Sequence, residues 1–292
     1  MSFRNKYCYQ INNNFYIVKS MIKMLKFLFA LTLLILSIAE PQAQNVTKEV
    51  YKKTPTRDLT LKIYSPSGLK QNDKRPAIVF FFGGGWNGRN LDQFERHAKV
   101  LSNKGMVCFI ADYRVKSTDK VTPDKCIMDA KSAMRYVYAN AGRFNVDTTM
   151  IAASGGSAGG HLAAATCYCQ GFDDPNDDKT VNCRPNALVL YNPVVDNSKE
   201  GYGYSRVKKF YPAFSPAENV KNPVPTIFFV GSEDKFITPE LSKKFKQRCE
   251  AAGGRCDLHI FEGREHGFFN KDDYEKTMEM TVDFLKSIGY IK

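Results

Sequence analysis

The stretch AASGGSAGGHLAAA, residues 152–165, decides how the rest of the sequence is interpreted. An apolar run, MIAAS (150–154), precedes its glycines and an alanine-rich segment follows them, so GGSAG (155–159) lies at a strand-to-helix turn. The pattern Gly-x-Ser-x-Gly at such a turn is typical of a nucleophile elbow, which exposes the serine hydroxyl. Only very small residues fit two positions before and after that serine. This favours Ser157 over Ser154, because the residue two positions before Ser154 is alanine.

The same turn would place the Ser157 hydroxyl at the N-terminus of a helix. The partial positive charge of a helix N-terminus favours a developing anion. The alternative is a glycine-rich loop without chemistry, and the motif alone does not decide between the two. The decision rests on whether the chain also supplies a base, a carboxylate and anion-binding amides.

Apolar runs alternate with amphipathic segments along the chain. The predicted strands are residues 48–53 and 59–66, which form a hairpin, and 77–82, 107–113, 150–154, 187–194, 226–231 and 257–263. The predicted helices are residues 91–104, 123–140, 158–169, 238–252 and 272–288. Runs that are apolar on both faces are typical of covered parallel strands. The alternation therefore predicts an α/β fold, with one mostly parallel sheet and helices on both faces.

The sequence also predicts how two of the helices begin and where two irregular segments lie. Thr122 and Thr238 are each followed by a proline, so we expect them to cap the helices that begin there. The segments 171–185 and 196–222 fall outside the alternation. We expect both to form the rim of a site at the carboxyl edge of the sheet, with plain surface loops as the alternative.

Four histidines are candidates for the base. His266 follows the last predicted strand and precedes the last helix, which places it in a loop at the carboxyl edge. His161 lies one helical turn beyond Ser157 and should point into the packing, while His97 and His259 fall within a helix and a strand. The sequence therefore predicts His266 as the base.

The orienting carboxylate is expected directly after the strand at 226–231. Asp234 occupies this position, with Glu233 beside it as the alternative. The resulting chain order, Ser157, Asp234, His266, is that of the α/β-hydrolases. An earlier strand ends in three glycines, so we expect the backbone N–H groups of Gly84 and Gly85, with that of Ala158, to form the oxyanion hole.

These residues resemble the hormone-sensitive-lipase-like esterases of the α/β-hydrolase fold, and most of all their small secreted bacterial members, the acetyl, xylan and feruloyl esterases. The resemblance covers about residues 59–288. It rests on the motifs GGGW (83–86), ADYR (111–114), SGGSAGGHLA (154–163), SPAENV (215–220), VPTIFFVGSEDKFITP (224–239) and EHGF (265–268). It implies cleavage of short-chain carboxylic esters through an acyl-enzyme, without a cofactor.

The sequence departs from this family in two respects. Phe82 stands where the family usually has a histidine that braces the oxyanion loop, so the bracing of that loop is in question. There is also no large N-terminal cap, and an open site suits a bulky substrate such as a decorated polysaccharide. Trp86 is a candidate for stacking on a sugar ring, with a packing role as the alternative.

The N-terminal segment has the pattern of a secretion signal. Lys23 and Lys26 precede a short apolar run, Phe27–Ala39. We expect residues 1–43 to be a cleaved signal peptide, with translation starting at Met1, Met21 or Met24, and 44–292 to be a single secreted or periplasmic domain. The alternative is an uncleaved anchor, but the apolar run is shorter than the roughly 17–25 residues that span a bilayer.

Charge and cysteine content indicate which binding partners, disulfides and metal sites to expect. The net charge of +12 at pH 7 is spread over scattered lysines, with no basic strip, so a nucleic-acid partner is not expected. Export would permit disulfides. A disulfide can join Cys249 to Cys256, and another can join Cys183 to Cys169 or Cys167. Cys108 lies within a predicted strand, so we expect it to be a buried free thiol. The histidines are not spaced to complete a zinc site with these cysteines.

Three functions compete on this evidence. The first is a secreted serine carboxylesterase that cleaves acetyl-type esters, on a small molecule or on a polysaccharide. The second is a serine peptidase of the same fold, which usually carries an additional domain to select peptides. The third is a catalytically inactive binding protein, which should lack at least one of the serine, histidine and aspartate, and none is missing here.

Overall fold

The computed structural model of this protein describes residues 19, 21–26 and 45–292. Contacts divide the chain into two units, Met1–Ala43 and Gln44–Lys292. The predicted signal peptide lies outside the described residues, apart from residue 19 and residues 21–26. Within the residues that the structure describes, no helix is both long enough and apolar enough to cross a membrane.

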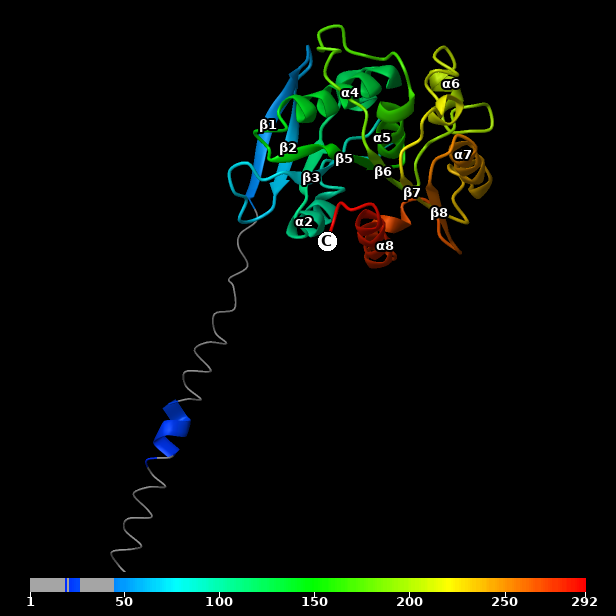
Figure 1. Ribbon diagram of the computed structural model, residues 1–292. Coiled ribbons are helices and arrows are strands. Elements are labelled where there is room, and N and C mark those ends of the chain that lie inside the picture. The colour runs from blue at the N-terminus through cyan, green and yellow to red at the C-terminus, as the bar shows by residue number, and fades with distance from the viewer. Residues whose placement is uncertain (1–18, 20, 27–44) are drawn as a thin grey trace, which may run out of the picture. The chain divides into compact units, whose positions relative to one another are not determined.

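Residues 45–292 form one eight-stranded sheet (Figure 1). Its strands, in the spatial order β1-β2-β4-β3-β5-β6-β7-β8, run parallel except that β2 pairs antiparallel with both β1 and β4. The strands are β1 (Asn45–Lys53), β2 (Asp58–Ser65), β3 (Arg75–Phe81), β4 (Val107–Ala111), β5 (Val146–Gly156), β6 (Ala187–Tyr191), β7 (Thr226–Gly231) and β8 (Cys256–Phe261). Each corresponds to a predicted strand, and the α/β prediction is confirmed.

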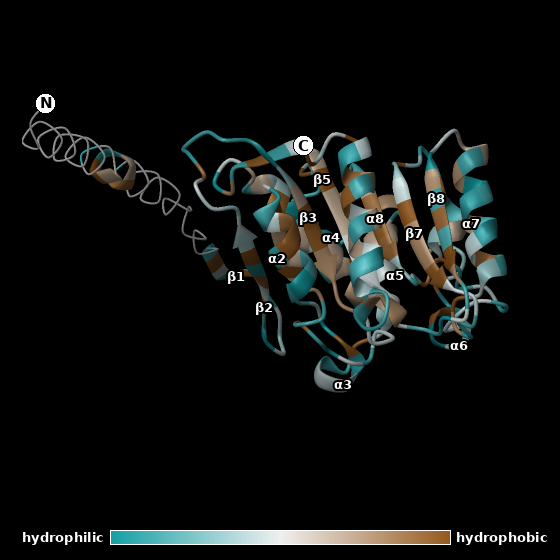
Figure 2. Cartoon of the chain, turned by 90° about the horizontal axis from the view of Figure 1, so that it is seen from below, coloured by the Kyte–Doolittle hydropathy of each residue, from teal (hydrophilic) through white to brown (hydrophobic). Residues whose placement is uncertain are grey.

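Helices cover both faces of the sheet. They are α2 (Glu95–Asn103), α3 (Lys116–Asp119), α4 (Pro123–Ala139), α5 (Ala158–Tyr168), α6 (Tyr204–Val207), α7 (Pro239–Ala251) and α8 (Tyr274–Ser287), with two short 3-10 helices at Pro216–Asn219 and Phe268–Asn270. In Figure 1, α4 and α5 lie above the sheet, and α2 and α8 lie below it. Figure 2 shows a hydrophilic outer face on α8, as expected for a helix that buries one side.

The sheet separates two hydrophobic cores. Side chains alternate between the faces of a strand, so Val79 and Phe81 of β3 pack with α4 and α5, whereas Ile78 and Phe80 pack with α2 and α8. Strands β4, β6 and β7 are buried along their whole length. This explains why the sequence shows these strands as uninterrupted apolar runs.

The two predicted helix caps differ. The Thr238 hydroxyl accepts a hydrogen bond from the Leu241 amide at 3.4 Å, so it caps α7 as predicted. The prediction is wrong for Thr122, which makes no side-chain cap to α4 because its hydroxyl donates to the Asp124 carboxylate.

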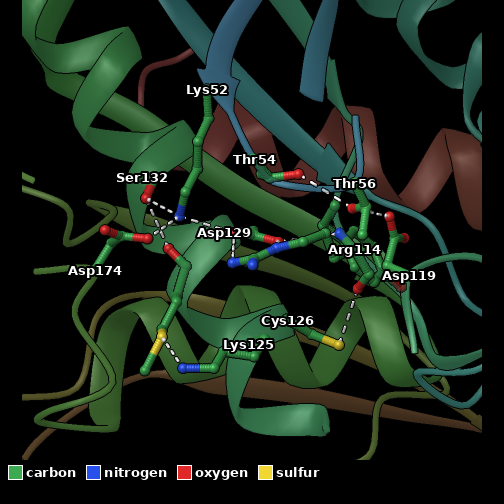
Figure 3. Close-up of polar contacts among 12 residues, drawn as sticks. Lys52, Thr54, Thr56, Arg114, Asp119, Lys125, Cys126, Asp129, Ser132 and Asp174 are labelled. Carbon is green, nitrogen blue, oxygen red and sulfur yellow. Dashed lines mark hydrogen bonds and ion pairs between the residues drawn. The ribbon is translucent and has the colours of Figure 1, made fainter. Parts of the chain in front are cut away.

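A buried cluster of charges ties the N-terminal hairpin to α4 (Figure 3). Lys52 at the end of β1 lies 2.8 Å from Asp129 and 2.7 Å from Asp174, and it donates to the Ser132 hydroxyl. The Arg114 guanidinium donates two hydrogen bonds to the same Asp129 carboxylate, which is fully buried. The hairpin is therefore held by ion pairs as well as by its strand pairing.

The segment 171–185 does not form the rim of the site, contrary to the prediction. Helix α5 begins at the carboxyl edge of the sheet and, at about 1.5 Å per residue, carries the chain to the opposite edge before this segment starts. There Asp173 and Asp177 bind Arg135 of α4, at 2.6 and 3.2 Å. The second segment, 196–222, does reach the site, through Tyr202.

The cysteines are thiols in this structure. All seven within residues 45–292 are free, so neither the pairing of Cys183 with Cys167 or Cys169 nor the Cys249–Cys256 bond is formed. Cys249 at the end of α7 and Cys256 at the start of β8 are nevertheless neighbours. A hydrogen bond between the two thiols lowers the pKa of Cys249 and raises that of Cys256.

Candidate active site

Ser157 lies at the turn between β5 and α5 in a strained backbone conformation. Its φ of 53° and ψ of −119° lie outside the regions that L-residues ordinarily occupy. The turn is tight enough that a Cβ on Gly155 would overlap the backbone of Gly159, and a Cβ on Gly159 would overlap the Phe81 carbonyl oxygen. Ser154, the alternative, is fully buried within β5. The glycines thus fix which serine is presented.

The structure brings the three predicted side chains into one hydrogen-bonded chain. His266 Nε2 lies 2.9 Å from Ser157 Oγ, and His266 Nδ1 lies 2.7 Å from Asp234 Oδ2. The Asp234 side chain is completely buried, and its Oδ1 accepts hydrogen bonds from the amides of Phe236 and Ile237, both at 2.9 Å. Glu233, the alternative carboxylate, is exposed. A buried carboxylate in this position fixes a proton on Nδ1 and leaves Nε2 free to accept one.

Asn192 is a site residue that the sequence analysis missed. It follows β6 directly, it is buried, and its Nδ2 lies 3.4 Å from His266 Nε2. Its Oδ1 accepts a hydrogen bond from the Gly267 amide at 3.3 Å. Asn192 therefore contacts the loop that carries His266 at two points. A polar residue at the carboxyl end of an apolar strand was the available signal.

The other histidines have the structural roles that were predicted. His161 is buried, and its Nε2 lies 3.0 Å from the Phe214 carbonyl oxygen. Burial lowers its pKa to about 4. His97 packs among aromatic rings below the sheet, where burial lowers its pKa to about 3. His259 lies in β8, 5.7 Å from the ring of Phe229.

The glycine loop after β3 presents backbone amides beside Ser157. Gly84 and Gly85 have positive φ values, 126° and 61°, and both line the same cavity as Ser157. In the described part of the chain, neither amide has a hydrogen-bond partner, nor does the amide of Ala158 at the start of α5. The Gly83 amide is occupied, because it donates to Gln93 Oε1 at 2.6 Å. The loop and the start of α5 thus leave free the three amides that were predicted as donors.

Contacts from several segments brace this loop in place of the missing histidine. The Phe82 ring stacks on Tyr113 with centroids 4.0 Å apart, and the Tyr113 hydroxyl donates to the Phe82 carbonyl at 2.6 Å. Arg206 of α6 donates to the Gly85 carbonyl at 2.7 Å. Gln93 holds the loop from the other end, through Gly83. No sequence pattern predicted these contacts, although Tyr113 belongs to the ADYR motif.

The aspartate of the same motif holds the end of the loop. Asp112 accepts two hydrogen bonds from Arg89, at 3.0 and 2.7 Å, and also pairs with Arg57. Arg89 lies four residues after Gly85 in the sequence. Two arginines on one buried carboxylate therefore anchor the point at which the loop leaves the site.

The cavity over Ser157 has a volume of about 260 Å³. Its lining comprises Gly83, Gly84, Gly85, Gln93, Ser157, Asn192, Tyr202, Phe236, His266, Gly267 and Phe269. Trp86 is not among them, so its prediction as a sugar-stacking residue is wrong. Only 1% of its surface is exposed, because it packs against His161, Tyr202 and Phe214. The exposed aromatic ring at this cavity belongs to Phe236.

Comparison with known proteins gives this geometry a family. The BD-FAE family matches residues 61–200, and the prolyl oligopeptidase family matches residues 191–289. The acetylxylan esterase of Xylanibacter ruminicola is 24% identical over 68% of this chain, and the esterase LipC of Mycobacterium tuberculosis is 37% identical over 66% of it. The chain spans 42% and 53% of the length of these two relatives.

A solved structure covers nearly the whole folded unit. The apo form of Thermogutta terrifontis esterase 2 is 39% identical, has a TM-score of 0.80, and matches over 88% of this chain and 98% of its own. The chain belongs to the esterases of the α/β-hydrolase fold, which are carboxylic ester hydrolases.

Proposed function

We propose that this protein is a secreted serine esterase that removes short acyl groups, of the acetyl type, from a carbohydrate. The observation that carries the proposal is the hydrogen-bonded chain from buried Asp234 through His266 to Ser157, at 2.7 and 2.9 Å. It ends beside three backbone amides that have no partner among the described residues. Together these groups supply a nucleophile, a base and an oxyanion hole.

In the acylation step, Ser157 Oγ attacks the ester carbonyl carbon while its proton moves to His266 Nε2. The carbonyl oxygen becomes an oxyanion that accepts hydrogen bonds from the amides of Gly84, Gly85 and Ala158. Asp234 stabilises the imidazolium without accepting its proton. When the tetrahedral intermediate collapses, His266 Nε2 donates the proton to the leaving alcohol oxygen, and the acyl group remains on Ser157.

In the deacylation step, water replaces the alcohol. His266 accepts a proton from the water, the hydroxide attacks the acyl carbon, and the same amides receive the second oxyanion. Collapse releases the carboxylic acid, and His266 returns the proton to Ser157 Oγ. With the ester and one water molecule, the groups of this chain balance both steps.

Cavity size supports a short acyl group. A volume of about 260 Å³ is small for an enzyme pocket, and Phe269 closes one wall against Gly156, where a Cβ would lie 2.6 Å from its ring. Structures of the Thermogutta esterase 2 are described with propionate and with butyrate bound. The carbohydrate part of the proposal is supported by the similarity to an acetylxylan esterase.

Hydrolysis of p-nitrophenyl acetate tests the mechanism. We expect Ser157→Ala to lower kcat by at least about 10⁴-fold, as for other serine nucleophiles. Ser154→Ala is the matched control, since it removes a buried hydroxyl three residues away and should retain activity. Undiminished turnover by the Ser157 variant would refute the proposal. A fluorophosphonate probe separates an enzyme from an inactive binding protein, because only a working Ser157 becomes labelled.

A second candidate, hydrolysis of amides, is favoured by one observation. The prolyl oligopeptidase match at residues 191–289 includes both Asp234 and His266. A peptide p-nitroanilide and the corresponding p-nitrophenyl ester separate the two activities. The esterase proposal requires kcat/KM to be higher for the ester by far more than the intrinsic difference in reactivity between the two bonds.

Substrate and export each have a direct test. Acetylated xylan, a feruloylated ester and a simple aryl acetate can be compared at equal ester concentration, and we expect the acetylated xylan to be deacetylated. For export, residues 1–292 can be expressed in bacteria and the N-terminus of the enzyme outside the cytoplasm determined. We expect that N-terminus after Ala39 or Ala43, and an intact N-terminal segment would contradict secretion by cleavage.

A further inference from the structure

Phe236 combines exposure with a place at the catalytic cavity. Its surface is 54% exposed, in the loop between β7 and α7. Other large hydrophobic residues are exposed in the described part of the chain, but Phe236 is the one that lines the cavity over Ser157. An exposed apolar ring at the mouth of a binding site is more informative than one elsewhere on the surface.

The ring is held in a defined orientation. Its backbone is fixed because the amides of Phe236 and Ile237 both donate to Asp234 Oδ1. The ring stands edge-on to His266, with centroids 5.2 Å apart and an interplanar angle of 80°. It makes a similar contact with Tyr202, at 5.7 Å and 83°. Phe236 is thus a rigid aromatic surface, which loses little entropy when a ligand packs on it.

The position beside His266 assigns this surface to the alcohol half of an ester. His266 Nε2 must donate a proton to the leaving alcohol oxygen, so that oxygen must come within about 3 Å of it. The remainder of the alcohol then lies along the groups next to the imidazole, and Phe236 is one of them. Phe269, in contrast, is buried and packs against Gly156, away from solvent, so it cannot serve a bulky alcohol.

We propose that Phe236 and Tyr202 form the wall of an alcohol subsite that favours esters of ring-shaped alcohols over esters of small linear ones. A ring presents a flat or C–H-rich face that packs on the exposed aromatic surface. A methyl or ethyl group is too small to cover that surface. Both a sugar and an aryl alcohol have such a face. This inference rests on the proposed function, and it adds which residues recognise the group that leaves.

The test uses acetates that differ only in the alcohol: methyl acetate, phenyl acetate and a mono-acetylated methyl xyloside. All three form the same acetyl-enzyme, so recognition of the alcohol must appear in kcat/KM, which reports acylation. The readout is kcat/KM for each ring acetate divided by kcat/KM for methyl acetate. Any change that a variant causes in all three acetates cancels in this ratio.

We expect Phe236→Ala and Phe236→Leu to lower the ratio by about three- to tenfold, the range measured for aromatic contacts. Phe236→Tyr keeps the ring and should retain the ratio of the parent enzyme. Ile260→Ala is the matched control, because it removes an exposed apolar side chain on β8 that does not line the cavity. It should leave activity on all three acetates unchanged.

The two sources of a ring are distinguished by the two ring acetates. A fall for the xyloside acetate supports a sugar, a fall for phenyl acetate supports an aryl group, and a fall for both supports a general ring subsite. An unchanged ratio in the Ala and Leu variants, with methyl acetate still hydrolysed, overturns the subsite and leaves the esterase proposal standing. Failure of the parent enzyme on every acetate would instead refute the proposed function.

Discussion

Single atoms decide which serine is presented and how tightly the elbow can turn. Ser157 holds a positive φ while two segments of backbone approach each other across the positions of Gly155 and Gly159. Glycine is required there because of the neighbouring atoms, since a side chain would occupy space already filled by backbone. The strain at Ser157 is thus maintained by packing on both sides of it.

Replacing Gly159 by alanine should therefore be severely destabilising. The new Cβ would overlap the Phe81 carbonyl oxygen at the end of β3, and backbone at the centre of a sheet cannot move away cheaply. We expect a loss of about 3 kcal/mol or more in the free energy of unfolding, measured by urea denaturation. Gly142→Ala is the control, because no atom lies within 4 Å of its added Cβ. Equal stability of the two variants would contradict the argument.

At the scale of elements, a buried carboxylate connects the N-terminal hairpin to α4. Asp129 lies in the second turn of α4 and faces Lys52 from β1 and Arg114 from the segment after β4. Its side chain is fully buried, whereas both cations are slightly exposed. Removal of one partner would leave the others desolvated and unpaired, which is why such pairs are costly to break.

Asp129→Asn should accordingly cost about 3–5 kcal/mol in the free energy of unfolding. Glu275→Gln provides the comparison, since it breaks an ion pair with Arg96 at the surface. The Arg96 side chain is 61% exposed and the Glu275 side chain is 77% exposed. The exposed pair should contribute about 0–1 kcal/mol. Denaturant titrations of both variants at low and moderate salt check this difference. A loss of similar size in both would show that Asp129 has no special role.

The elements themselves could be predicted from sequence because their signals are local. Within residues 45–292, apolar runs and helical periodicity predicted every strand and every helix longer than four residues. The meeting of Ser157, Asp234 and His266 was predictable because each follows a parallel strand, and such strands end at one edge. The prediction that Trp86 stacks on a sugar ring was wrong because the residues that bury it, in α5 and at Phe214, lie far along the chain. Gln93 was missed for the same reason, because its contact with the Gly83 amide leaves no pattern in the sequence, whereas Asn192 could have been found from its position at the end of an apolar strand.

At the scale of the whole molecule, the sheet keeps a neutral histidine buried on each side. His97 is buried on α2, in the core between the sheet and helices α2 and α8, and His161 lies in α5 on the opposite face. Burial lowers the pKa of His97 to about 3 and that of His161 to about 4, from 6.5. Because the folded state binds these protons less readily than the unfolded state, the stabilisation is present above about pH 6.5 and is lost as the pH falls toward these values.

The free energy of unfolding should thus decrease by about 2 kcal/mol per buried histidine between pH 7 and pH 5. His97→Phe should remove its share of this pH dependence. Among the described residues neither ring nitrogen of His97 has a hydrogen-bond partner, so the substitution loses no hydrogen bond. Urea denaturation of parent and variant at both pH values gives the two slopes. If the free energy of unfolding of the variant falls as much between pH 7 and pH 5 as that of the parent, His97 does not contribute to the pH dependence.

The bracing of the glycine loop also has a consequence for the hydrolysis of water-insoluble esters. Tyr113, Gln93 and Arg206 hold that loop from three separate parts of the chain before any ester arrives. A lipase with a closed lid gains activity abruptly when droplets form. Here the anion-binding groups are already assembled, so rates with tributyrin should rise smoothly through its solubility limit, with no step at the appearance of an oil–water interface.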